Sequence, residues 1–160
     1  MTSALRLEKI TADNVDAACA VTVRAGQERF VESVARSLAE AYVHPDIAWP
    51  RLILDGDQPV GFVMAFFDVH FYDTDPPDLL RSGLWRLNIA ADHQGHGYGR
   101  FAVRAVCDEI RRRGGSRATV TYAPDDDGPR DFYLRLGFHP TGELSGNQPV
   151  AELHLPTQSA

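Results

Sequence analysis

Residues 93–100 read His93-Gln94-Gly95-His96-Gly97-Tyr98-Gly99-Arg100, with three glycines alternating with larger side chains. An apolar run, 84–89, precedes this stretch, and 101–110 follows with apolar residues at helical spacing. A helix N-terminus carries about four unpaired N–H groups and a partial positive charge. Glycines let an anion approach those groups closely. The stretch therefore predicts a phosphate site between a strand and a helix.

Three phosphate-binding patterns compete for this stretch. A Walker loop ends in Gly-Lys-Ser/Thr, whereas this chain has Gly99-Arg100-Phe101. A dinucleotide fingerprint that starts at Gly95 would need glycine where Arg100 stands. The third pattern, Gln/Arg-x-x-Gly-x-Gly/Ala, is met by Gln94, Gly97 and Gly99. The alternative without a ligand is a glycine-rich turn that only caps a helix.

The periodicity of the remaining sequence predicts one mixed α/β domain over 1–160. An acidic, proline-containing segment, 68–78, is expected to be a loop. We expect strands near 5–10, 52–54, 60–67, 84–89 and 117–122, two more within 138–155, and helices near 15–23, 31–41, 100–113 and 128–136.

Composition and charge narrow the class of protein. The chain has 160 residues and a formal net charge of −6, which argues against a nucleic-acid partner. It shows no apolar signal core and no membrane-length apolar run, so we expect no membrane partner and a cytoplasmic location. Cys19 and Cys107 are predicted to be buried, inert thiols in a reducing compartment. His93 and His96 have no evident third ligand, so no metal site is predicted.

On the motif of Gln94, Gly97 and Gly99, the chain resembles the GNAT superfamily of N-acetyltransferases, in which this pattern is the acyl-CoA pyrophosphate loop. Residues 132–138, Phe-Tyr-Leu-Arg-Leu-Gly-Phe, resemble the family's Tyr-x-x-x-Gly-Phe ending of the last helix. The resemblance implies an α/β (α+β) fold. It would have a mixed, mostly antiparallel sheet of about seven strands, a splayed fourth strand and about four helices.

The resemblance also implies acetyl-CoA as co-substrate, without a metal. Tyr133 would face the sulfur of CoA and assist the leaving thiolate. The backbone of 87–89 would bind the pantetheine arm and the thioester carbonyl. Asp126 stands where the family often has Asn. The implied cofactor-binding residues are Leu87, Asn88, Ile89, Gln94, Gly95, His96, Gly97, Tyr98, Gly99, Arg100 and Asp126.

Motifs in the first half resemble the bacterial spermine/spermidine acetyltransferase branch. They include Gln27-x-x-Phe30-Val31, 37–41 (SLAEA) and 60–64 (VGFVM). The resemblance implies that a polyamine amine is the small-molecule acceptor. One departure is Gly146-Asn147, where many relatives have Gly-Glu.

Acyl transfer requires a neutral amine, although a free alkylamine has a pKa near that of Lys, about 10.4. Strand 84–89 carries no carboxylate that could accept the proton. The simpler interpretation of each candidate is a solvated surface charge or a helix ion pair. The candidate bases, acting through water, are Glu28, Glu40, Asp68, His70 and Asp73, and the candidate substrate contacts are Glu28, Glu40, Asp68, Asp73 and Trp85.

Two other functions stay open from the sequence. One is the same chemistry on a protein N-terminus, a lysine or an amine antibiotic. The other is an acyl-CoA sensor without turnover. Direct attack in a ternary complex is expected because neither cysteine is placed as a nucleophile. A homodimer is compatible with a strand edge expected near 150–155.

Overall fold

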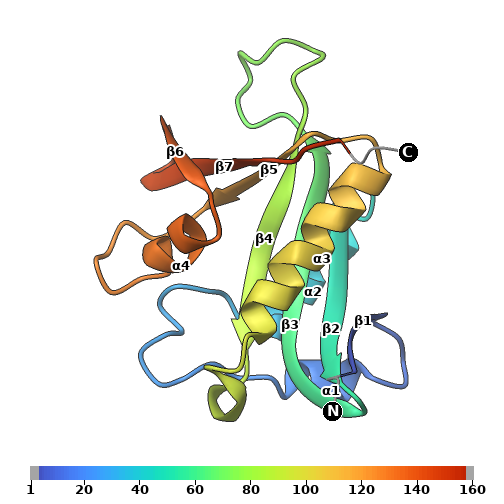
Figure 1. Ribbon diagram of the computed structural model, residues 1–160. Coiled ribbons are helices and arrows are strands. Elements are labelled where there is room, and N and C mark those ends of the chain that lie inside the picture. The colour runs from blue at the N-terminus through green and yellow to red at the C-terminus, as the bar shows by residue number, and fades with distance from the viewer. Residues whose placement is uncertain (1–3, 158–160) are drawn as a thin grey trace.

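One mixed sheet of seven strands forms the centre of the protein, in a computed structural model that describes residues 4–157. The strands are β1 (Leu5–Lys9), β2 (Ala48–Asp55), β3 (Gln58–Val69), β4 (Arg81–Ile89), β5 (Arg117–Thr121), β6 (His139–Ser145) and β7 (Gln148–His154). Their order across the sheet is β1-β2-β3-β4-β5-β7-β6 (Figure 1). Neighbours are antiparallel except β4 and β5, which are parallel. The predicted fold class is confirmed.

Helices cover both faces of the sheet. They are α1 (Val15–Cys19), α2 (Val34–Val43), α3 (Tyr98–Arg112) and α4 (Arg130–Arg135), with a short 3₁₀ turn η1 (Ala91–His93). Helix α3 crosses one face diagonally, whereas α1 and α2 lie behind the sheet (Figure 1). The described residues thus contain four α-helices, as expected.

Strand β3 is buried on both faces and separates two apolar clusters. Val63 and Ala65 pack on the side of α3, together with Val106. Phe62 and Met64 point the other way and pack with the cluster that α1 and α2 complete. This alternation follows from the two-residue period of a strand. It makes β3 and its neighbour β4 a rigid floor for the site.

Helix α2 begins three residues later than the predicted start at Val31. Ser33 is its N-cap, and the Ser33 hydroxyl accepts a 3.1 Å hydrogen bond from the N–H of Arg36. Such a cap satisfies one of the unpaired donors of the first turn. Phe30 and Val31 are thereby left outside the helix and line a cavity.

Helix α1 ends at Cys19, four residues before the predicted end. Thr22 lies outside it, and its carbonyl accepts a 2.8 Å hydrogen bond from the N–H of Ala91. This bond fixes the α1–α2 loop (residues 20–33) to the start of the glycine stretch. The shorter helix leaves Cys19 exposed, so its predicted burial is wrong, whereas Cys107 is buried as expected. Burial raises the pKa of the Cys107 thiol to about 11, which keeps it protonated.

Two strand predictions need correction. Strand β2 begins at Ala48 rather than Leu52, and Pro50 fits within it because β1 pairs only with residues 51–55. Proline has no backbone N–H to donate to a neighbouring strand, so it is tolerated at a position where no neighbouring strand would accept that hydrogen bond. The strand near 150–155 is not an edge, since β7 lies between β5 and β6. A homodimer stays a prediction, and the edge that it could use on this side is β6.

Gly83 is the residue at which β4 and β5 touch. It pairs with Thr119, and a Cβ at Gly83 would lie 1.7 Å from the Thr119 carbonyl oxygen. Because that atom belongs to the backbone of a buried strand, it cannot move aside. We expect Gly83→Ala to lower the free energy of unfolding by about 3 kcal/mol, at the upper end for overpacked sites. Urea unfolding measures this change, and an unaltered midpoint would contradict the close approach.

Candidate active site

A cavity of about 910 Å³ opens where β4 and β5 part. Beyond the pair of Gly83 and Thr119, β4 runs on to Ile89 while β5 turns away (Figure 1). On the other side, Met64 pairs with Arg86 and Ala65 with Leu84, so Trp85 is an extra residue that bulges from β4. The bulge lies four residues before the end of β4 at Ile89. The splayed fourth strand itself is as predicted.

The splay leaves backbone groups of β4 directed into the cavity. The N–H of Ala90 donates to the carbonyl of Val60 on β3, and Asn88 follows the same register. Because backbone groups alternate along a strand, those of Leu87 and Ile89 point away from β3, toward the open side. An N–H group there is a preorganised donor for a developing oxyanion.

The glycine stretch forms an open cradle at the N-terminus of α3. Gly95 and Gly97 both have φ of +82°, which favours glycine, and no atom lies within 4 Å of a Cβ built at either. Gly97 is the N-cap of α3. Gly99 packs closely, since its Cβ would lie 3.2 Å from Cζ of Phe132. The unpaired N–H groups of the first turn and the open glycines together fit a pyrophosphate.

The side chain of Gln94 is occupied by protein partners. Its Nε2 donates to the Ile89 carbonyl at 3.0 Å and to Oε1 of Gln27 at 2.7 Å. The Nε2 of Gln27 donates back to Oε1 of Gln94 at 3.2 Å. Gln94 therefore holds the cradle to β4 and to the α1–α2 loop. It also lines the cavity, and its contact with the cofactor stays a prediction.

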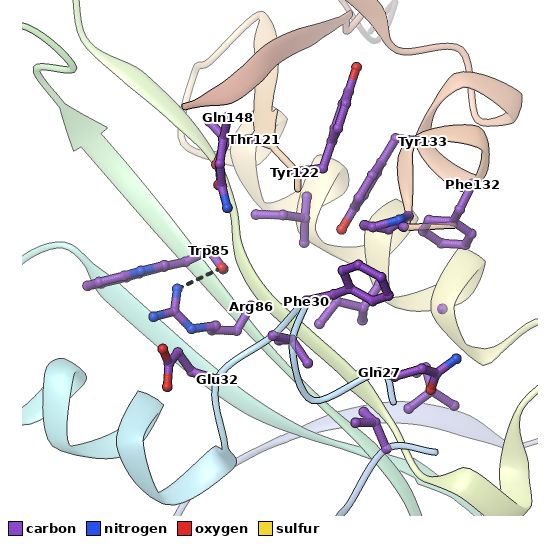
Figure 2. A pocket seen from close by; sticks show the side chains of 18 of the residues that line it. Gln27, Phe30, Glu32, Trp85, Arg86, Thr121, Tyr122, Phe132, Tyr133 and Gln148 are labelled. Atoms are coloured by element: carbon purple, nitrogen blue, oxygen red, sulfur yellow. Dashed lines mark hydrogen bonds between the residues drawn. The ribbon is translucent and has the colours of Figure 1, made fainter. Parts of the chain in front are cut away.

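Tyr133 lies on α4, buried, with its hydroxyl in the cavity (Figure 2). Its ring stacks on Tyr122 at 6.2 Å between centroids and meets Phe132 and Phe138 edge-on. Figure 2 shows the two tyrosine hydroxyls at opposite ends of the stack, with that of Tyr133 toward Phe30. Burial raises the pKa of Tyr133, so the group is a neutral hydrogen-bond donor rather than a ready proton source.

The structure separates the predicted acidic residues. Glu28 lines the cavity, and so does Trp85, which packs its indole against the α2 side. Asp68 and Asp73 are exposed residues outside the cavity lining, and His70 contacts the carbonyl of Pro77 there. The acidic loop therefore does not supply a row of carboxylates to the site.

Glu40 also lies outside the cavity lining, beneath its floor. Both of its carboxylate oxygens accept 3.2 Å hydrogen bonds from Nη2 of Arg86, and Nε of Arg36 donates to it at 2.9 Å. Burial, the largest influence, lowers the pKa of the Arg86 guanidinium, while Glu40 opposes that shift. Glu40 thus neutralises a cation that lines the cavity.

Two residues that were predicted to bind the cofactor lie outside the cavity lining. Asp126 and His96 are exposed and are not among the lining residues. The neighbouring Asp127 does line the cavity and forms an ion pair with Arg29 of the α1–α2 loop. The predicted cofactor-binding residues that line the cavity are Leu87, Ile89, Gln94, Gly95, Gly97, Tyr98, Gly99 and Arg100. Asn88 is buried and donates to the Glu32 carbonyl on the opposite face.

Sequence reasoning missed Glu32 and Phe30 as site residues. Both lie in the α1–α2 loop, and Figure 2 shows Phe30 in the middle of the cavity and Glu32 beside Arg86. Phe30 also approaches Gly128, whose Cβ would lie 3.6 Å from its ring. The Ser33 cap was the available signal, because it shows that the helix starts after Glu32.

Two further observations concern metals and membranes. Among residues 4–157, no group of three His, Cys, Asp or Glu side chains is placed to hold a metal ion. His93 and His96 instead lie near the ring of Tyr98, whose hydroxyl donates to Asp55 at 2.7 Å. No helix in the same range has the length and apolarity needed to cross a bilayer.

Comparison with known proteins identifies the architecture. The model of the acetyltransferase (GNAT) family matches residues 19–138. N-alpha-acetyltransferase 30 of Schizosaccharomyces pombe is 28% identical over 115 residues, which cover 70% of this chain and 71% of that protein. Residues 19–138, which the family model matches, contain the cradle, the splayed strand and Tyr133.

Solved structures share the fold at low sequence identity. Aminoglycoside acetyltransferase AAC(6′)-Ib in complex with coenzyme A superimposes with a TM-score of 0.74 at 15% identity, covering 94% of this chain and 95% of that one. The PaiA N-acetyltransferase of Thermoplasma acidophilum, also in complex with coenzyme A, gives 0.67 at 11% identity, with 96% and 99% covered.

Proposed function

Because the chain belongs to the acetyltransferase (GNAT) family and is an acetyl-CoA-dependent N-acetyltransferase, we propose that its acceptor is a primary amine of a polyamine. The observation that carries this proposal is a pair of carboxylates on the cavity, Glu28 and Glu32. Neither forms an ion pair within the described residues. A polyamine has a second ammonium group, which such a carboxylate can bind.

The chain supplies three groups to the reaction. Acetyl-CoA, when bound, provides the thioester. The N–H groups of Leu87 and Ile89 donate hydrogen bonds to the thioester carbonyl oxygen, on which negative charge develops in the space between β4 and β5. The hydroxyl of Tyr133 donates a hydrogen bond to the departing sulfur, and its raised pKa favours donation over full proton transfer. The ammonium proton leaves through water, because β4 carries no carboxylate.

Charge on the acceptor side favours a cation. Glu40 neutralises Arg86, and Arg29 pairs with Asp127. Glu32 lies beside Arg86 on the cavity and forms no ion pair of its own among residues 4–157 (Figure 2). A carboxylate on the cavity without an ion pair can bind an alkylammonium group.

A protein N-terminus is the second candidate acceptor. The relative from Schizosaccharomyces pombe carries the name of an N-alpha-acetyltransferase, and it is similar over most of both chains. A peptide would enter beside the α1–α2 loop and the β6–β7 hairpin, where Ser145 and Gln148 line the cavity.

The test is release of CoA thiol from acetyl-CoA with spermidine, spermine, diamines, aminoglycosides and short peptides. Saturable turnover with polyamines, well above hydrolysis, is expected. Turnover with peptides or aminoglycosides alone would show that the acceptor is not a polyamine, and the acetyltransferase activity would stand. Binding of acetyl-CoA without turnover on any acceptor would indicate a sensor.

Glu32→Gln is expected to raise the KM for spermidine about 10-fold while leaving kcat within a factor of two. The reason is the loss of one charge-assisted contact, worth about 1.4 kcal/mol. Asp57→Asn, which removes an exposed carboxylate at the tip of the β2–β3 hairpin, is the matched control. Steady-state kinetics with spermidine measure both variants. Equal KM values in all three proteins would remove Glu32 from acceptor binding.

A further inference from the structure

The active-site cavity has an apolar end. Four residues line it there with hydrocarbon side chains: Ile47, which precedes β2, Phe66 and Val69 of β3, and Phe71 of the β3–β4 loop. They are called the apolar compartment below. We propose that the apolar compartment binds a hydrocarbon segment of the acceptor, beyond its second nitrogen. This inference rests on the proposed function, in which the acceptor is a small amine with two or more nitrogens.

The side chains of the apolar compartment form one surface. Phe66 lies two residues beyond Met64 on β3, so it points to the sheet face that carries α2, opposite α3. The ring centroids of Phe66 and Phe71 are 5.7 Å apart. The carbonyl of Ile47 accepts a 3.0 Å hydrogen bond from the N–H of Phe67, the neighbour of Phe66. The compartment therefore lies where the end of β3 meets the start of β2.

The position of the compartment along β4 sets which part of an acceptor reaches it. Phe66 pairs with Gly83, four residues before Leu87. At about 3.3 Å per residue, this separation is roughly 13 Å. Arg86 lies between these two positions, and Figure 2 shows Glu32 beside it. An amine that reacts near Leu87 can thus place its second nitrogen at Glu32 and the chain that follows in the compartment.

Phe71 is held in place by residues outside the cavity lining. Its N–H donates to Oδ2 of Asp75 at 3.2 Å, within the β3–β4 loop that projects beyond the sheet (Figure 1). The guanidinium of Arg81 lies 5.0 Å from the centroid of the Phe71 ring and donates two hydrogen bonds to Glu143, at 3.0 and 2.9 Å. The half-buried ring is therefore a preorganised wall, which lowers the entropy cost of binding.

The chemistry of this surface selects hydrocarbon. Burial of one methylene group strengthens binding by up to about fourfold. A hydroxyl or ammonium group in the same place would lose its hydrogen bonds to water, and the four side chains offer none in return. The carboxylates of the cavity thus select charge, whereas the compartment selects the length of the chain. Acceptors that are polar along their whole length, such as aminoglycosides, are disfavoured.

The test is steady-state turnover of the full chain with acetyl-CoA and a series of N-alkyl-1,3-diaminopropanes, from N-methyl to N-butyl. The series keeps the primary amine and the second nitrogen and varies the hydrocarbon alone. We expect kcat/KM to rise about 10-fold or more from N-methyl to N-butyl, mainly through a lower KM.

Two variants of the compartment test its part in this increase. Phe71→Ala should reduce the increase to about threefold and leave kcat/KM for the N-methyl compound within about a factor of two. Val69→Thr, which keeps the shape of the side chain but adds a hydroxyl, should act in the same direction. Tyr42→Ala removes an exposed ring of α2 that lies outside the cavity lining, and it should retain the full increase. Circular dichroism melting establishes that the proteins compared are folded.

Equal kcat/KM across the series in the unsubstituted protein would overturn the inference and leave the polyamine acceptor in place. So would full increases in both Phe71→Ala and Val69→Thr. Octylamine has the chain length of the N-butyl compound but no second nitrogen. Equal turnover of these two would support the compartment and overturn the polyamine acceptor. Absence of turnover with every amine of the panel would overturn both proposals.

Discussion

Replacing Gly97 by valine is expected to weaken CoA binding about 100-fold, which corresponds to roughly 2.8 kcal/mol. Gly97 caps α3 with φ of +82°, a conformation that is a genuine outlier for a β-branched residue. The substituted loop must leave this conformation, and the N–H groups of the first turn of α3 then no longer converge on one anion. Titration with CoA measures the loss.

Gly142→Val is the matched control for that variant. Gly142 lies in β6 with φ of +87°, and no atom lies within 4 Å of its Cβ position, as is true of Gly97. Both variants should lose a similar free energy of unfolding, about 1–2 kcal/mol, because the backbone strain is the same. Only Gly97→Val should lose CoA. Similar CoA affinities in the two variants would show that the cradle does not bind the pyrophosphate.

Tyr133→Phe is expected to lower kcat about 100-fold with little change in CoA affinity. In the proposed mechanism the hydroxyl donates to the departing sulfur, and removal of such a donor lowers the rate by about two orders of magnitude. The ring remains, so its packing on Tyr122, Phe132 and Phe138 is preserved. Steady-state turnover and CoA titration together separate the catalytic loss from a binding loss.

Tyr122→Phe removes the hydroxyl at the other end of the stacked pair and is the control. It should retain kcat within a factor of two, since Figure 2 shows that hydroxyl directed away from the cavity. An equal loss in both variants would indicate that the stack, rather than the hydroxyl of Tyr133, matters.

The raised pKa of Tyr133 also predicts how kcat/KM depends on pH. Burial raises this pKa above the value of about 10 for a free tyrosine, so the hydroxyl stays protonated to higher pH. The acceptor amine becomes more nucleophilic as pH rises toward its own pKa. We therefore expect kcat/KM to rise between about pH 7 and pH 9.5, with no decline below about pH 10 that belongs to Tyr133. A decline near pH 8 would contradict a buried, neutral tyrosine.

The cradle shows how far local sequence reaches. Gly95 and Gly97 have a positive φ, and Gly99 packs closely against Phe132. Because these requirements arise within a few residues or from one contact, a short motif identified all three glycines. The same holds for the amphipathic helix α3. The acidic candidates were different, because their roles depend on contacts far apart in sequence. Glu40 meets Arg86 across 46 residues, and this pairing removed it from the list of ligands for an amine.

The sequence by itself determined the α/β class and the place of the glycine cradle, and it predicted the tyrosine that we propose to serve the leaving group. Each follows from residue types at short, fixed spacing, which constrain the backbone directly. The tertiary structure alone decided which carboxylates reach the cavity, where β4 bulges, and that Ile47 and Phe71 line the same cavity. These outcomes depend on the packing of segments distant in the chain, and on the cost of burying a charge without a partner. A short sequence pattern predicts neither the packing of distant segments nor the cost of burying a charge.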